Sequence, residues 1–192
     1  MLTRIINGNV LTPSGWKKDC SVFVRDGKIV EISDTNLEVV GAEIFDAQGS
    51  YVVPGGIEIH AHGGGGSDFM EGTEEAFRVA TQTHLRHGTT AIFPTLAASS
   101  TEMIMAAAAT TEKLMAKPNS IIMGLNLEGP YFNMDMAGGQ IPEYIRNPQP
   151  EEDTYILENT NCIKRWDAAP ELEGAIDFGR YVSSKGLIAS IG

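Results

Sequence analysis

Residues 54–63 read PGGIEIHAHG, an apolar stretch that ends in two histidines one residue apart. Side chains two residues apart in a β-strand point to the same face, so we expect His60 and His62 to project side by side. Two neighbouring imidazoles can share one metal ion. The alternative is a pair of hydrogen-bonded structural histidines, but a His-x-His pair that closes an apolar strand before a glycine-rich loop favours metal binding.

The chain after this stretch alternates between strand and helix patterns. We predict strands over 51–62, 89–96, 120–127, 162–168 and 187–191, and helices over 73–87, 99–115, 150–158 and 171–185. Repeated β-then-α units with nearly continuous apolar strands are typical of a parallel sheet. The pattern therefore predicts an α/β fold for residues 51–192.

Residues 1–50 have a different pattern, with short strand candidates and no helix. These candidates cover 4–10, 21–25, 28–32 and 43–46. Asp26-Gly27 separates two of them, and an Asp-Gly pair between apolar runs is a strong hairpin signal. We therefore predict two domains, a small all-β segment over 1–50 and the α/β part over 51–192.

The composition excludes several kinds of partner. The chain has 192 residues, 42% of them hydrophobic, and a net charge of −11. Binding to nucleic acid needs a basic surface, so we expect no nucleic-acid partner. We see no signal peptide and no apolar run of membrane-spanning length, and the two cysteines form no motif. We expect a cytoplasmic protein without a membrane partner.

Polar residues follow the predicted strands, and they define a candidate metal site. The carboxyl ends of parallel strands share one edge, which brings Glu128 near His60 and His62. Two neutral imidazoles and one carboxylate suit zinc or a comparable divalent ion with an open position for water. Such an ion polarises a carbonyl and lowers the pKa of its bound water to about 7. The alternative for Glu128 is a surface or helix-capping carboxylate.

Several stretches together resemble the amidohydrolase superfamily and, within it, the N-acetylglucosamine-6-phosphate deacetylase family. The main ones are residues 54–63 and the segment NLEGPY at 126–131. Supporting stretches are GTT at 88–90, FPTL at 93–96, the loop 138–148 and AAPE at 168–171. The resemblance covers the whole chain in order, and it corresponds to the N-terminal half of the family.

The resemblance implies both a fold and an activity. The fold is a (β/α)8 TIM-type barrel, of which this chain would supply about five of eight strands, preceded by part of a small β-sandwich in residues 1–50. The activity is hydrolysis of the acetamide of N-acetylglucosamine 6-phosphate, an amino-sugar phosphate, to glucosamine 6-phosphate and acetate. The implied cofactor is a divalent metal, zinc or iron, with one or two ions per complete site. The full-length protein would be a homodimer.

The resemblance also assigns roles to particular residues. Glu128 would bind the catalytic metal, and His60 and His62 match the positions that bind a second metal in binuclear members. Gly139 and Gln140 would contact substrate, although the family usually has a histidine where this chain has Gln140. Glutamine donates and accepts hydrogen bonds but carries no charge.

The family's later metal-binding histidines, phosphate-binding residues and catalytic Asp correspond to positions beyond Gly192. We therefore assign no catalytic residue within residues 1–192 and expect this chain alone to be inactive or nearly so. Two alternatives stay open. One is another metal-dependent amidohydrolase, dihydroorotase- or D-aminoacylase-like, although Lys164 lies early in its strand rather than at the end where a bridging lysine would be needed. The other is a non-catalytic remnant, or a subunit that completes its barrel with a partner.

Overall fold

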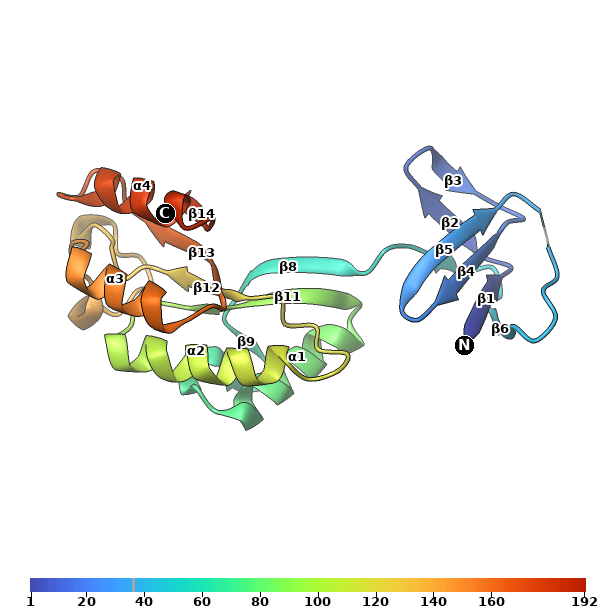
Figure 1. Ribbon diagram of the computed structural model, residues 1–192, viewed down its shortest axis with the longest axis horizontal. Helices are drawn as coiled ribbons and strands as arrows, with labels where there is room; N and C mark the ends of the chain where they lie inside the picture. The colour runs from blue at the N-terminus through green and yellow to red at the C-terminus, as the bar shows by residue number, and fades with distance from the viewer. Residues whose placement is uncertain (36) are drawn as a thin grey trace. The chain divides into compact units, whose positions relative to one another are not determined.

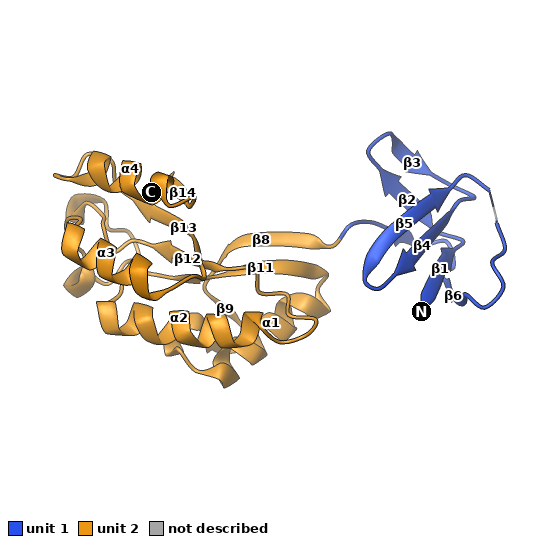
Figure 2. Cartoon of the chain, in the orientation of Figure 1, with its two compact units in different colours: residues 1–54 blue, residues 55–192 orange. Residues whose placement is uncertain are grey.

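The computed structural model describes residues 1–35 and 37–192, which divide into two compact units, 1–54 and 55–192 (Figure 2). The first unit consists of two small sheets. One has the order β5-β4-β1-β6 and the other the order β3-β2-β7. Their strands are β1 (Leu2–Ile6), β2 (Asn9–Thr12), β3 (Gly15–Lys17), β4 (Ser21–Arg25), β5 (Lys28–Ser33), β6 (Glu43–Asp46) and β7 (Tyr51–Val52).

One apolar cluster joins both sheets of the first unit. Val10 of β2 and Val22 of β4 are buried in it together with Cys20. The predicted hairpin is confirmed, because β4 and β5 pair antiparallel on either side of Asp26 and Gly27. Both turn residues have positive φ, 52° and 74°, as a tight hairpin turn requires.

Two strand predictions in this part of the chain are wrong. The predicted strand 4–10 is interrupted because Asn7 has a left-handed φ of 56°, which ends β1 and redirects the chain into β2. The predicted strand 51–62 is two strands. Tyr51 and Val52 pair with β2 in the first unit, and the barrel strand starts only at Gly56, beyond Pro54, which has no N–H for a ladder.

The second unit is a curled parallel sheet of five strands in the order β14-β13-β12-β11-β8, so neighbours in space are also successive major strands of the chain (Figure 1). In the chain, a helix follows each of β8, β11, β12 and β13. The strands are β8 (Gly56–Ala61), β11 (Thr89–Leu96), β12 (Leu125–Glu128), β13 (Ile163–Ala168) and β14 (Ile188–Ile191), and the helices are α1 (Glu74–Arg86), α2 (Thr101–Met115), α3 (Pro150–Asn159) and α4 (Ala175–Ser184). This arrangement confirms the predicted α/β fold and partial TIM-type barrel.

Short elements occupy the connections. β9 (Gly63–Gly64) and β10 (Ser67–Asp68) form a small hairpin, and the 3-10 turns are η1 (Phe69–Glu71), η2 (Met134–Met136) and η3 (Pro142–Tyr144). The predicted strand 120–127 shrinks to β12, with only an isolated bridge from Ile122 to Ile92 before it. The helix predicted over 171–185 starts at Ala175, because Gly174 before it has a φ of 82°.

Side-chain caps start α1 and α2 where the sequence predicts. Thr73 Oγ1 accepts a hydrogen bond from Ala76 N at 3.2 Å, and Ser100 Oγ accepts one from Met103 N at 3.3 Å. Each cap satisfies a backbone N–H that has no partner within the helix. The caps fix where the helices begin and hence how long the connections from the strand ends are.

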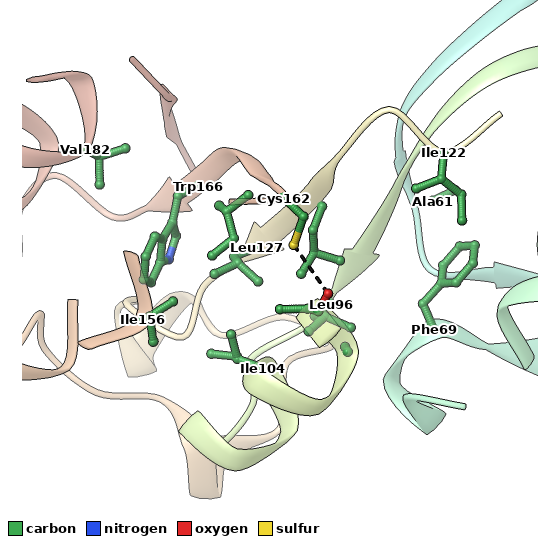
Figure 3. Packing of buried hydrophobic residues seen from close by; sticks show 14 of the residues in the cluster. Ala61, Phe69, Leu96, Ile104, Ile122, Leu127, Ile156, Cys162, Trp166 and Val182 are labelled. Carbon is green, nitrogen blue, oxygen red and sulfur yellow. Dashed lines mark hydrogen bonds between the residues drawn. The ribbon is translucent and has the colours of Figure 1, made fainter. Parts of the chain in front are cut away.

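The core of the second unit lies between the sheet and its helices (Figure 3). Leu127 of β12 and Trp166 of β13 pack with Ile104 of α2 and Ile156 of α3, and all four are buried. Burying such a side chain contributes about 1.5–3 kcal/mol. Polar residues such as His60 and Glu128 lie outside this core, at the carboxyl ends of the strands. Among the helices of residues 1–35 and 37–192, none is both long and apolar enough to cross a bilayer.

Candidate metal centre

The three predicted metal ligands meet at the carboxyl ends of the strands. His60 lies near the end of β8, His62 directly after it, and Glu128 is the last residue of β12. His60 Nε2 is 3.4 Å from Glu128 Oε1, and His62 Nε2 is 3.0 Å from Glu128 Oε2. One donor atom from each residue lies within 4.8 Å of the other two. The strand periodicity and the curl of the sheet thus produce a compact trio of donors.

The chain after His62 turns sharply, and Gly63 permits this turn. A Cβ at Gly63 would lie 2.1 Å from the Ser67 carbonyl oxygen across the β9–β10 hairpin, a distance that no side chain tolerates. The hairpin therefore needs glycine here. The same hairpin bonds to a helix, because His84 Nε2 of α1 lies 3.0 Å from the Gly63 carbonyl oxygen. The segment after His62 is therefore fixed both by the pairing of β9 with β10 and by the hydrogen bond to α1.

Glu128 is held by the packing that follows it. The buried Trp166 indole donates from Nε1 to the Gly129 carbonyl oxygen at 2.9 Å, and the ring stacks on Tyr131 with 5.7 Å between centroids. Gly129 has a φ of 86°, a conformation that favours glycine. These contacts fix the chain directly after β12, so the Glu128 carboxylate has a defined position.

The charges of the trio stabilise one another. The pKa of Glu128 is lowered chiefly by its hydrogen bond with His62 and also by the charge of His60, while burial opposes the shift. The pKa of His62 is raised chiefly by its hydrogen bond to Glu128 and further by the charges of Glu128 and Asp68, while burial opposes the shift. Without a metal ion, this arrangement favours an ion pair between a protonated imidazole and a carboxylate.

The geometry of the trio fits a divalent metal ion. Bonds of 2.0–2.2 Å at tetrahedral angles place neighbouring ligand atoms about 3.4 Å apart. The 3.4 Å and 3.0 Å separations are close to that value. The side chains of His60, His62 and Glu128 are 34%, 41% and 24% exposed, which leaves an open side for water or substrate. Two imidazole nitrogens and one carboxylate oxygen suit zinc and iron alike.

The two predicted substrate-binding residues differ in their surroundings. Gln140 Oε1 accepts a hydrogen bond from Ala98 N at 2.6 Å, and the Gln140 side chain also hydrogen-bonds to Glu128. Because Oε1 faces a backbone donor, the amide nitrogen is the group available to Glu128. Gly139 is exposed and has open space around it. Gln140 therefore lies beside the trio, whereas Gly139 lines the solvent side of the loop.

The loop that carries Gln140 is tied down by Arg146. Arg146 binds Glu152 through two parallel contacts, Nε to Oε2 at 2.9 Å and Nη2 to Oε1 at 2.6 Å. Its Nη1 donates to the carbonyl oxygens of Ser99 and Tyr144. A bidentate pair of this kind fixes orientation as well as distance.

The site also contains polar residues beneath the trio that the sequence did not single out. Asn126, Arg165 and Asp167 lie within β12 and β13, and Asn126 and Asp167 are buried. Arg165 Nη1 lies 3.2 Å from His60 Nδ1, and Asp167 Oδ2 lies 3.8 Å from the same atom. The available signal was two charged residues, Arg165 and Asp167, at a spacing that puts them on one face of the strand.

Known proteins share this fold and sequence. A model described as the amidohydrolase family matches residues 51–174. N-acetylglucosamine-6-phosphate deacetylase from Haemophilus influenzae is 30% identical over 195 residues, which cover 100% of this chain and 50% of the relative. N-acetylgalactosamine-6-phosphate deacetylase from Escherichia coli O157:H7 is 26% identical, with the same coverage. The crystal structure of N-acetylglucosamine-6-phosphate deacetylase from Pasteurella multocida superposes with a TM-score of 0.93 at 25% identity, over 100% of this chain and 51% of that one.

The chain belongs to the amidohydrolase family, whose model covers most of its length. Within that family its similarity is to N-acetylglucosamine-6-phosphate deacetylases, which are hydrolases, and the resemblance inferred from the sequence is confirmed. The chain spans about half the length of the curated relatives it matches.

Proposed function

We propose that the protein carrying this chain hydrolyses the acetamide of N-acetylglucosamine 6-phosphate to glucosamine 6-phosphate and acetate. The observation that carries this proposal is the convergence of His60, His62 and Glu128 at the strand ends. It occurs in a chain that aligns over its whole length with deacetylases of this name. A mononuclear or binuclear metal site at that edge suits attack by water on an amide carbonyl.

The chain's own residues would divide the work as follows. Glu128, His60 and His62 hold one or two divalent ions, zinc or iron. A bound ion supplies an activated water molecule and polarises the acetamide carbonyl. Gln140 presents its amide nitrogen beside Glu128, and with Gly139 it would line the place of the sugar or acetyl group. The Arg146–Glu152 pair keeps the loop of both residues in position.

We expect residues 1–192 alone to bind the metal ion but to turn over little substrate. The resemblance assigns the acid–base Asp, further metal ligands and the phosphate site to positions after Gly192. The full-length protein would then be a cytoplasmic homodimer that acts on a small amino-sugar phosphate, without nucleic-acid or membrane partners. The alternatives of a dihydroorotase- or D-aminoacylase-like enzyme and of a non-catalytic subunit make different predictions in the assay below.

The test is acetate release by the zinc-loaded full-length protein and, in parallel, by residues 1–192. The substrates are N-acetylglucosamine 6-phosphate, N-acetylglucosamine without phosphate, dihydroorotate and an N-acetyl-D-amino acid, the last two read by their own products. We expect turnover of the sugar phosphate alone, and loss of it in Glu128→Gln. The proposal would be overturned if the full-length protein hydrolysed dihydroorotate or the N-acetyl-D-amino acid instead, or none of the four substrates.

A second substrate is favoured by a specific observation. Relatives named N-acetylgalactosamine-6-phosphate deacetylase match the chain at 26% and 29% identity, close to the values for the glucosamine enzymes. The two sugars differ only in the configuration at C4. N-acetylgalactosamine 6-phosphate therefore belongs in the same assay, and the larger kcat/KM decides between the two.

A further inference from the structure

The ring of His60 faces the candidate metal centre, but its contact with Arg165 favours a tautomer that conflicts with metal binding. Arg165 Nη1 lies within hydrogen-bond distance of His60 Nδ1, at 3.2 Å. A guanidinium only donates hydrogen bonds, so Nδ1 must accept with its lone pair. A neutral imidazole then carries its single proton on Nε2. Nε2 is the atom that faces Glu128 at 3.4 Å, and a metal ion would need its lone pair.

Asp167 offers the opposite arrangement at the same ring nitrogen. Its Oδ2 lies 3.8 Å from His60 Nδ1, and the residue is only 2% exposed. Its Oδ1 forms an ion pair with Arg165 Nη2 at 2.8 Å, and Nη2 donates its hydrogen bond to Ser190 Oγ, also at 2.8 Å. Among the residues that the structure describes, Oδ1 has no hydrogen-bond partner. A buried carboxylate, with its Oδ2 facing Nδ1, therefore lies beside His60.

The register of the sheet makes this juxtaposition. Asn126 pairs with Arg165 and Glu128 with Asp167 across β12 and β13. Residues two apart share a face, so Arg165 and Asp167 both point to the side of the trio. Asn126 Nδ2 reaches Asp167 Oδ2 at 3.5 Å, which leaves that oxygen free to accept a second bond. The carboxylate is thus fixed beneath the trio by the strands themselves.

His62 differs from His60 in this respect. Its Nε2 faces Glu128 Oε2 at 3.0 Å, and among the described residues no hydrogen bond from an arginine reaches its ring. Nothing therefore forces the proton of a neutral His62 onto Nε2. His62 therefore needs no rearrangement, and the conflict is confined to His60.

We infer that Asp167 is a positioning residue that accepts the Nδ1 proton of His60 and so frees Nε2 for a metal ion, while Arg165 opposes it by holding the other tautomer. This inference rests on the proposed metal site and deepens it. Metal-bound histidines usually donate their second ring N–H to a carboxylate or a carbonyl. Here the acceptor and its competitor lie two residues apart on one strand.

The test compares Zn²⁺ binding in the purified 192-residue protein, by competition with a chromophoric chelator, between wild type, Asp167→Asn and Arg165→Met. We expect Asp167→Asn to weaken binding roughly 10–100-fold, the usual effect of losing such a partner. Arg165→Met should tighten binding, because the competing donor is gone. If the Arg165–Asp167 pair only supports the fold, both variants change binding in the same direction, and the inference is overturned.

A second measurement does not depend on the variants folding. Imidazole ¹⁵N chemical shifts of the metal-free wild type should show His60 protonated at Nε2, and Zn²⁺ should move the proton to Nδ1. Protonation at Nδ1 before Zn²⁺ is added would overturn the inference and leave the metal site intact. A wild-type protein that binds no Zn²⁺ would overturn both the inference and the proposed metal site.

Discussion

His62 directly follows β8 and Glu128 ends β12, two strands that are not neighbours, yet His62 Nε2 and Glu128 Oε2 are 3.0 Å apart. In the sheet order, β11 lies between β8 and β12. A flat sheet would separate side chains two strands apart by about 10 Å at their backbones. The two side chains meet above the end of β11 because the sheet curls toward a barrel, so the fold class itself creates the candidate metal centre.

Replacing Glu128 with glutamine should remove metal binding while leaving the fold intact. The amide has nearly the same shape but no charge, and the trio loses its only anionic ligand. We expect Zn²⁺ affinity to fall by more than the roughly 10–100-fold that loss of an outer hydrogen-bond partner costs. Competition with a chelator measures this, and Glu173→Gln, at an exposed position, is the control. Equal affinities of the two variants would contradict the ligand role.

The His62–Glu128 pair should stabilise the metal-free protein most in weakly acidic solution. The raised pKa of His62 contributes stability below its ordinary value of 6.5, and this is lost as pH rises through the raised pKa. The lowered pKa of Glu128 contributes above its ordinary value of 4.5, and this is lost as pH falls through the lowered pKa. Both stabilising contributions are therefore present between pH 4.5 and pH 6.5.

Urea unfolding in a chelator, for wild type and His62→Gln across pH 4 to 9, checks this window. The stability difference should peak inside it at no more than about 1 kcal/mol, since the pair is partly exposed to solvent. Zn²⁺ binding should instead tighten as pH rises, because the imidazole must lose its proton to bind. A stability difference that does not vary with pH would contradict the ion pair.

Local sequence signals predicted much of the second unit. The strand 89–96 has the predicted bounds, and Thr73 and Ser100 cap their helices, because apolar runs and capping residues act over a few positions. The strand predicted over 51–62 failed because its first residues pair with a distant strand of the other unit. Pairing of that kind leaves no local trace.

The candidate metal ligands could also be predicted from local sequence, but the residues beneath them could not. The two-residue period predicted the juxtaposition of His60 and His62, and the strand end predicted Glu128. Arg165 and Asp167 were missed because their role depends on the register between β12 and β13, which the sequence of one strand does not specify. The placement of Arg165 and Asp167 beneath the ligands therefore becomes visible only once the strands are paired in the sheet.

Asp153 should make the protein less stable as pH rises through the weakly acidic range. Burial raises its pKa from 3.8 to about 6, although a hydrogen bond from Tyr131 Oη opposes the shift. A folded-state pKa above the unfolded value means that the stabilising contribution is present below 3.8 and is lost as pH rises toward 6. The shift of about two units corresponds to at most about 3 kcal/mol.

Asp153→Asn should flatten this dependence, because the amide still accepts from Tyr131 but does not ionise. Urea unfolding at pH 4, 5, 6 and 7 measures the slope, with Glu158→Gln at an exposed position of α3 as the matched control. Wild type and Glu158→Gln should lose stability in parallel over this range, and Asp153→Asn should lose less. Parallel curves for all three proteins would show that Asp153 ionises as an ordinary carboxyl.

Gln140→Leu should separate a substrate contact from support of the metal ligand. The variant removes the bond to Glu128 and leaves the Ala98 N–H without its acceptor. A lost hydrogen bond to a charged group costs about 1.5–3 kcal/mol, so Zn²⁺ affinity of the chain should fall roughly 10- to 100-fold. Gln149→Leu is the matched control, because that exposed side chain makes no capping bond. If Gln140 only touches substrate, Gln140→Leu will bind Zn²⁺ as Gln149→Leu does, and its effect will appear solely in the KM of the full-length enzyme.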